Sequence, residues 1–130
     1  MCIRDRCFTV GQSLTPATLG APRSCALGWA IVFETATGNV ATYSDQWVYY
    51  ISGDGKIFKS TNGANNFIQL TPNEISISAI SGFSVLGAEA YPGDTQQPLV
   101  GIKLVGTITN NTVVTPFSVQ TSVTQRLVDI

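Results

Sequence analysis

The 130-residue chain contains no histidine, and charged residues make up only 12% of it. Without histidine, the Ser-His-Asp arrangement of hydrolases is excluded, and a cysteine nucleophile lacks its usual neighbouring base. The formal net charge of −1 provides no basic excess to hold phosphate groups. We therefore expect neither catalysis of these kinds nor binding to nucleic acid.

Other absences narrow the class of protein further. No run of about 20 apolar residues occurs, so no segment of this sequence is expected to span a membrane as a helix. There is no CxxC pair, which together with the missing histidine argues against a zinc site. A GxSxG motif and a phosphate-binding glycine loop are absent as well. The acidic residues are scattered and select no catalytic pair, so the sequence predicts no enzyme, no metal and no cofactor.

What the sequence does contain favours strands. Threonine, serine, valine, isoleucine, glycine and asparagine are abundant, a composition typical of strands and turns. The length corresponds to about one domain and is sufficient to bury a core. We therefore expect one mainly β, antiparallel sheet domain.

The clearest strand pattern lies in the C-terminal run 115–130. Apolar residues and threonine alternate with polar residues over 117–123, which predicts a strand with one buried face and one solvent-facing face. The run 99–108 has apolar residues at alternate positions and is suited to pair with it. Turn residues around Asn110 and Asn111 predict that the two runs form an antiparallel hairpin.

A second hairpin is predicted over residues 47–59. The aromatic and β-branched run WVYYI prefers strands, and an Asp54-Gly55 turn follows it. Further short strands are predicted at 40–44, 67–70, 74–80 and 82–87. With these, the chain has eight or nine short strands and no amphipathic helix, which predicts an all-β fold.

Residues 28–34, GWAIVFE, form the first predicted strand. Trp29, Ile31 and Phe33 are expected to share one face, and the alternate residues are apolar too. A strand that is apolar on both sides is expected to be covered on both sides.

The chain divides into three parts. Residues 1–6, MCIRDR, resemble a translated sequencing-adapter remnant, so we expect a non-native segment and a native chain that extended upstream of Cys7. Residues 7–27 are expected to form a loop or the remnant of a connection, because Pro16 and Pro22 argue against a long helix. Residues 28–130 form the β-domain.

Cys7 and Cys25 are an even pair once Cys2 is set aside with the first six residues. One disulfide in an oxidising compartment and two free, part-buried thiols are both compatible with the sequence.

Two groups of polar and aromatic residues deserve a functional test. Oxygen ligands on tight turns can hold calcium, but ordinary turn chemistry explains the same residues without a metal. The calcium candidates are Asp45, Asp54, Asn62, Asn65 and Asn66, with Asp94, Gln96 and Gln97 as a weaker second set.

Aromatic rings can stack on sugars or bases, although packing in the core is favoured here. The aromatic candidates are Trp29, Trp47, Tyr49 and Tyr50. Arg126 is expected on the polar face of the last strand.

Three stretches resemble the C-terminal β-domain of bacterial type IV pilin-like proteins and pseudopilins, the family with a prepilin-type cleavage and methylation segment. They are residues 80–108, 115–130 and 25–33. In that family a strand reading QP.V.I.L.G is commonly followed by a terminal strand reading PF.LQT.VSQR. Here residues 97–104 read QPLVGIKL, and residues 116–126 read PFSVQTSVTQR. The stretch CALGWAIVF resembles the strand that follows the long helix of the family.

The resemblance implies a pilin-type fold that lacks most or all of the N-terminal long helix, because no GFTLIE-type segment precedes these strands. It implies a non-catalytic filament subunit of a type IV pilus, competence or type II secretion system. The expected partners are other pilin or pseudopilin subunits, and the membrane is contacted only through the N-terminal helix. The expected location is the periplasm or cell surface, with anchoring in the inner membrane before assembly.

The alternative hypothesis is a secreted or cell-surface β-sandwich module, for example one that binds carbohydrate. It would use Trp47, Tyr49 or Tyr91 as exposed stacking residues, so the exposure of these rings distinguishes the two hypotheses.

Overall fold

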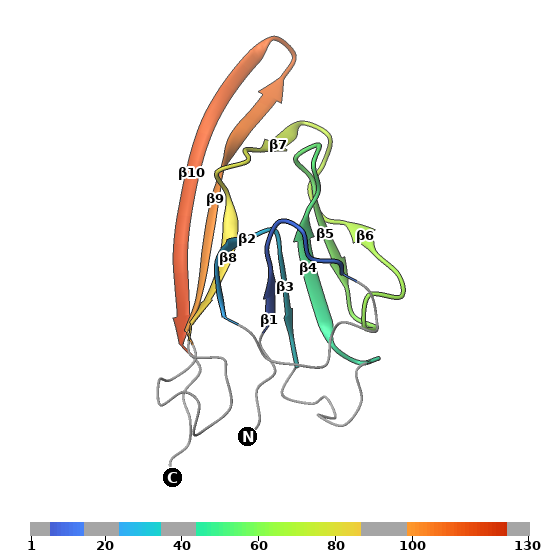
Figure 1. Ribbon diagram of the computed structural model, residues 1–130. Helices are drawn as coiled ribbons and strands as arrows, with labels where there is room; N and C mark the ends of the chain where they lie inside the picture. The colour runs from blue at the N-terminus through green and yellow to red at the C-terminus, as the bar shows by residue number, and fades with distance from the viewer. Residues whose placement is uncertain (1–5, 15–23, 35–43, 87–98, 125–130) are drawn as a thin grey trace.

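The structure is a computed structural model that describes residues 6–14, 24–34, 44–86 and 99–124. These residues form ten strands in two five-stranded antiparallel sheets and contain no helix (Figure 1). The predicted all-β class is therefore confirmed for the part of the chain that is described.

The first sheet has the strand order β1-β3-β4-β5-β6. Its strands are β1 (Arg6–Phe8), β3 (Ala30–Phe33), β4 (Trp47–Ile51), β5 (Ile57–Ser60) and β6 (Ile68–Gln69). The predicted hairpin over 47–59 is confirmed as β4 and β5, with Ile51 opposite Ile57 and residues 52–56 as the loop.

The second sheet has the order β10-β9-β8-β2, and β7 also pairs with β9. Its strands are β2 (Cys25–Gly28), β7 (Ile75–Ile77), β8 (Gly82–Leu86), β9 (Leu99–Asn110) and β10 (Val113–Thr124). The C-terminal hairpin is confirmed, with twelve residues in each strand: β9 ends two residues later than predicted and β10 begins two residues earlier, and residues 125–130 of the predicted run lie outside the described residues. Its turn consists of Asn111 and Thr112, and Asn111 has a φ of 56°, as the first central residue of a type II′ turn requires.

The β7 and β8 strands share one edge of β9, and a side chain fills the gap between them. Strand β8 pairs with β9 up to Lys103, and β7 pairs with it from Gly106. At Val105 between them, the Ser81 hydroxyl accepts a bond from the backbone N–H at 2.8 Å and donates one to the carbonyl at 3.0 Å. The Val105 carbonyl also accepts a bond from the Ser78 N–H at 2.7 Å, so the hydroxyl is needed mainly for the Val105 N–H, which no strand reaches there.

Two predictions about the N-terminal half need correction. Residues 7–27 were expected to be a loop or the remnant of a connection, but 7–8 belong to β1 and 25–27 to β2, and 15–23 lie outside the described residues. The strand predicted over 28–34 is interrupted at Trp29, because the chain passes there from the second sheet to the first. Trp29 therefore packs with Phe8, on the opposite side of the first sheet from Ile31.

The main core lies between the two sheets. Its buried side chains are Cys7, Ile31, Phe83 and Val85, and Tyr49, Ile51, Val100 and Ile102 are among those that pack around them. A second buried cluster on the other face of the first sheet contains Phe8, Ala30, Val32 and Val48. The expectation that the strand at 28–34 is covered on both sides is therefore confirmed at β3.

The expected buried face of β10 is wrong for most of the strand. Phe117 is part-buried against Gly106, but Val119 and Val123 are 52% and 58% exposed. These valines lie on the face turned toward the first sheet, opposite Leu104 and Val100 of β9. The first sheet does not reach far enough to cover them.

Several predicted features lie outside the described residues: the strand at 40–43, the loop 88–98 with Tyr91, Asp94, Gln96 and Gln97, and Arg126.

Candidate functional site: an apolar groove between the sheets

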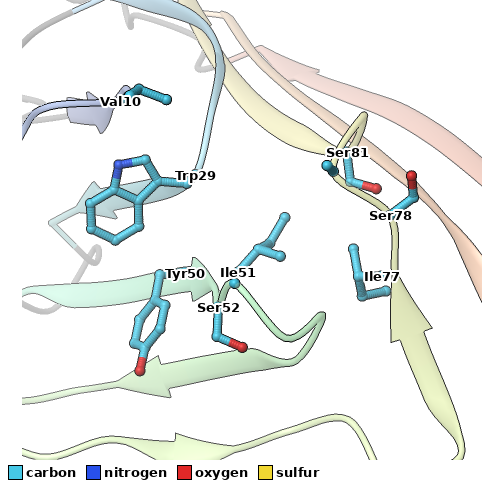
Figure 2. A pocket seen from close by; sticks show the side chains of 10 residues that line it. Val10, Trp29, Tyr50, Ile51, Ser52, Ile77, Ser78 and Ser81 are labelled. Atoms are coloured by element: carbon cyan, nitrogen blue, oxygen red, sulfur yellow. The ribbon is translucent and has the colours of Figure 1, made fainter.

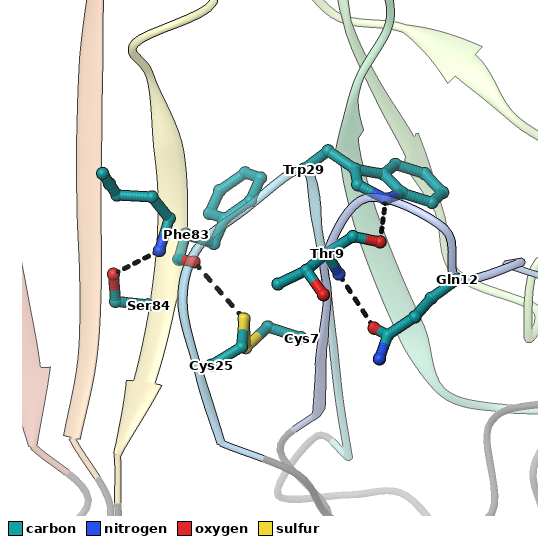
Figure 3. The surroundings of a disulfide bond; sticks show 8 residues. Cys7, Thr9, Gln12, Cys25, Trp29, Phe83 and Ser84 are labelled. Carbon is teal, nitrogen blue, oxygen red and sulfur yellow. Dashed lines mark hydrogen bonds between the residues drawn. A yellow bond between two sulfur atoms is a disulfide. The ribbon is translucent and has the colours of Figure 1, made fainter.

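A disulfide links the two sheets along one edge. Cys7 in β1 is bonded to Cys25 in β2, with the two Cα atoms 5.9 Å apart (Figure 3). Both strands are at sheet edges, and Gly28 of β2 lies so close to β1 that a Cβ there would collide with the carbonyl oxygen of Phe8. The disulfide links the sheets on the β1–β2 side, and the absence of a side chain at Gly28 lets the two strands come close enough there.

Hydrogen bonds fix the crossing from β2 to β3 beside the disulfide. The Trp29 backbone N–H donates to Phe8 O at 2.8 Å. Its indole Nε1–H donates to Thr9 O at 3.0 Å, as Figure 3 shows. Leu27, with a φ of 51°, sits at an irregularity in the β2–β8 pairing, and its N–H donates to the Ser84 hydroxyl. The chain thus changes sheets without leaving these donors unpaired.

A second link joins the sheets where β4 turns into β5. The N–H of Ile77 in β7 donates to Gly55 O at 2.9 Å. The Lys56 ammonium group donates to the carbonyl oxygens of Asn73 at 3.0 Å and Ile75 at 2.6 Å. The 52–56 loop of the first sheet is therefore held against β7 of the second.

An apolar groove of about 550 Å³ lies between the sheets and begins beside the disulfide, because Ile31 and Phe83 of its lining pack against Cys7. Its lining residues are Ile31, Phe33, Glu34, Tyr49, Ile57, Leu70, Phe83, Val100, Ile102, Leu104 and Val123. All but Glu34 and Tyr49 have wholly hydrocarbon side chains. The groove can therefore hold apolar groups by contact and supplies no set of acid, base and nucleophile.

The walls of the groove follow from the strand period. Ile31 and Phe33 are two residues apart on β3, so they point to the same side of the first sheet. Val100, Ile102 and Leu104 do the same on β9. The sequence pattern predicted these apolar faces, but not that they would remain partly apart.

A second cavity of about 600 Å³ lies near β7 (Figure 2). Trp29 and Tyr50 stand on one side, with Ile77, Ser78 and Ser81 on the other. Its two aromatic rings meet edge to face, with centroids 6.1 Å apart.

The aromatic candidates are in contact with their own neighbours. Lys59 Nζ lies 4.1 Å from the ring centroid of Trp47, and Phe33 stacks on Tyr49 at 5.9 Å. Tyr50 stacks on Phe58 at 5.0 Å. Trp47 and Tyr49 are part-buried, so their rings are partly occupied by these contacts.

The calcium candidates take part in turn hydrogen bonds. Asn62 Oδ1 accepts bonds from the Ser60 hydroxyl at 2.8 Å and from the Asn66 N–H at 3.0 Å, and Asn65 Nδ2 donates to Asn62 O. These bonds account for the side chains of the 60–66 loop as turn residues. Asp45 lies just before β4, separated in sequence from this loop.

Asp54 belongs to a different loop, the one between β4 and β5. The hydrogen bond from the Ser52 hydroxyl holds the pKa of the Asp54 carboxyl below its ordinary value of 3.8. Within the described residues, no group of three or more His, Cys, Asp or Glu side chains is placed to hold a metal ion.

The side chain of Gln46 was not singled out by the sequence. It is fully buried, and neither its amide nitrogen nor its oxygen has a hydrogen-bond partner among the residues that the structure describes. A buried amide without partners is destabilising, and no pattern in the sequence predicts that Gln46 is buried in this way.

Comparisons with protein-family models, with curated proteins and with solved structures found no match to this chain. No helix among the residues described is long and apolar enough to cross a membrane.

Proposed function

We propose that this chain is the β-domain of a non-enzymatic filament subunit, a pilin or pseudopilin of a type IV pilus, competence or type II secretion system. Its partners are other subunits of the filament, and it works outside the cytosol after anchoring in the inner membrane through an N-terminal helix. The similarity of residues 80–108 and 115–130 to that family motivates the proposal. The Cys7–Cys25 disulfide is consistent with an oxidising compartment.

The groove between the sheets is the observation that carries the proposal. A sheet domain that covers a helix needs an apolar surface left open to receive it. The groove supplies one, because its walls are nearly all hydrocarbon.

The size of the groove suits part of a helix. A helix about 10 Å across fills about 420 Å³ in each 5.4 Å turn. The groove, at about 550 Å³, therefore takes the apolar side chains along one stripe of a helix but does not enclose the rod. This matches a coat domain that lies on a filament core.

The DNA sequence upstream of the Cys7 codon in the source genome tests the proposal. We expect a GFTLIE-type cleavage segment followed by an apolar helix of at least about 20 residues. A complete upstream reading frame that lacks both would overturn the filament assignment.

A groove variant then tests the site itself. A synthetic peptide of the upstream helix should bind the β-domain in a fluorescence titration, and Leu104→Asp should weaken binding at least about tenfold, because it places a charge on the apolar wall. Ile108→Asp is the matched control, because Ile108 has the same parity on β9 but does not line the groove. Equal loss in both variants would argue against this groove as the seat of the helix.

A secreted or cell-surface carbohydrate-binding module is the second candidate. The cavity beside Trp29 and Tyr50 favours it, because its lining combines these aromatic rings with the hydroxyl groups of Ser52 and Ser78 (Figure 2). Against it, Trp47 and Tyr49 are partly occupied by Lys59 and Phe33, and Tyr91 lies outside the described residues. Titration with soluble oligosaccharides, followed by tryptophan fluorescence, distinguishes this candidate by a saturable change.

A further inference from the structure

The outer edge of β10 is a long strand edge that no described residue pairs with. Strand β10 has twelve residues and pairs only with β9 among the strands described. The other edge strands are short: β1 and β7 have three residues, β2 has four and β6 has two. A strand of matching length for β10 is therefore found, within this described fold, only on a second copy of the chain.

The hydrogen-bonding direction along β10 is set by its neighbours on β9. The N–H of Thr109 donates to Glu74 O, and the backbone groups of Val105 bond to Ser81. The backbone N–H and C=O groups of these odd-numbered residues of β9 therefore point away from β10. Because Val105 is opposite Ser118, the even-numbered residues of β10 present their backbone groups to the outer edge.

Edge strands are usually protected from pairing with another chain by charged residues or proline, and in β10 only one residue has this role. Residues 113–124 contain no charged side chain, so two copies meet without like-charge repulsion. Pro116 has an even number and lacks an N–H, so it blocks pairing near the turn. The outward backbone groups from Ser118 to the end of the strand remain available.

These constraints select one register. We propose that residues 118–124 of β10 pair antiparallel with the same residues of a second copy, with Thr121 on the two-fold axis. Ser118 then pairs with Thr124 of the second copy and Gln120 with Ser122, which gives about eight backbone hydrogen bonds. Moving the axis to Gln120 brings Pro116 into a bonded position, and moving it to Ser122 shortens the paired segment.

The same register covers exposed apolar side chains. Val119 of each copy lies opposite Val123 of the other, and these residues are 52% and 58% exposed in the single chain. A two-fold axis perpendicular to the sheet keeps both on one face, so two five-stranded sheets join into one. The inference does not depend on the filament proposal, because the strand edge sets the pairing, although Val123 also lines the groove.

Sedimentation equilibrium from micromolar to millimolar concentration tests the contact. We expect a monomer–dimer equilibrium, and Gln120→Pro should raise the dissociation constant about tenfold or more, because two backbone bonds across the axis are lost. Val114→Pro is the matched control, because Val114 also faces the outer edge but lies outside the paired segment. Circular dichroism checks that both variants keep the fold.

Cysteine cross-linking tests the register in a Cys2→Ser background. Side chains of directly opposed, non-bonded residues have Cβ atoms about 4.5–5.5 Å apart, close to what a disulfide requires. Thr121→Cys should therefore form a covalent dimer on mild oxidation, whereas Thr115→Cys, six residues away on the same face, should not.

Three outcomes would overturn the inference. The first is a protein that stays monomeric at millimolar concentration. The second is a dimer that Gln120→Pro and Val114→Pro weaken equally or not at all. The third is cross-linking at Thr115→Cys as efficient as at Thr121→Cys.

Discussion

Replacing Cys7 and Cys25 together by alanine should lower the free energy of unfolding by about 3 kcal/mol. The two cysteines are 18 residues apart in sequence, and a cross-link over that length removes about 11 cal/mol/K of chain entropy from the unfolded state. At 25 °C this corresponds to about 3 kcal/mol, or a fall in Tm of about 10 °C for a domain of this size. Alanine is preferred to serine because Cys7 is fully buried, and a hydroxyl there would need a partner.

Urea unfolding followed by circular dichroism measures this loss in a Cys2→Ser background. A reducing agent should destabilise the parent protein by a similar amount and leave the double alanine variant unchanged. Titration of the native parent with a thiol reagent should find no reactive cysteine. Two reactive thiols, or a loss below about 1 kcal/mol, would refute the reasoning that a disulfide restrains the unfolded chain.

Three further changes test other parts of the structure. Ser81→Ala leaves the Val105 N–H without its partner, whereas the carbonyl keeps the Ser78 N–H, and should cost about 1–3 kcal/mol in urea unfolding; an unchanged midpoint would contradict that role. Gln46→Met removes a buried, unpaired amide and should raise the unfolding midpoint, by about 1 kcal/mol in stability; a clear loss would indicate that the amide is satisfied. Because the pKa of Asp54 is lowered in the folded protein, its carboxylate stabilises the fold at pH values above 3.8. This contribution is lost as the pH falls through the lowered pKa. In an NMR titration its midpoint should lie below 3.8 and move up toward that value in Ser52→Ala; no difference between the two proteins would exclude the hydroxyl as the main cause.

The parts of the fold that were predicted correctly depend on neighbours in sequence. The β4–β5 hairpin combines a strand-forming run with the Asp54-Gly55 turn, and the β9–β10 hairpin combines two alternating runs with Asn111 between them. In both, the local pattern and the final pairing agree.

The parts that were missed depend on residues far apart in sequence. The break at Trp29 requires the carbonyl oxygens of Phe8 and Thr9 as partners, and β1 forms because β3 lies beside it. No pattern within 28–34 contains that information. The bond from Ser81 to Val105 joins residues 24 positions apart, so a serine before a strand gives no sign of it.

The sequence predicted the two apolar walls of the groove, but not the groove itself. Alternation on β3 and β9 identified the apolar faces, including Phe33 and Leu104. The space between them depends on how the two sheets diverge from the linked edge, which is a property of the assembled sandwich. The same divergence explains why the inner face of β10 is exposed at Val119 and Val123.

The links between the sheets also determine how the domain responds to force. Both the disulfide and the hydrogen bonds of Lys56 lie at the margins of the groove, so β10 can bend relative to β5 and β6 without breaking either link. We therefore expect a load applied across the groove to bend the β9–β10 hairpin first, and a load on the β1–β2 edge to be borne by the disulfide. The sandwich would then be more compliant on one side than on the other.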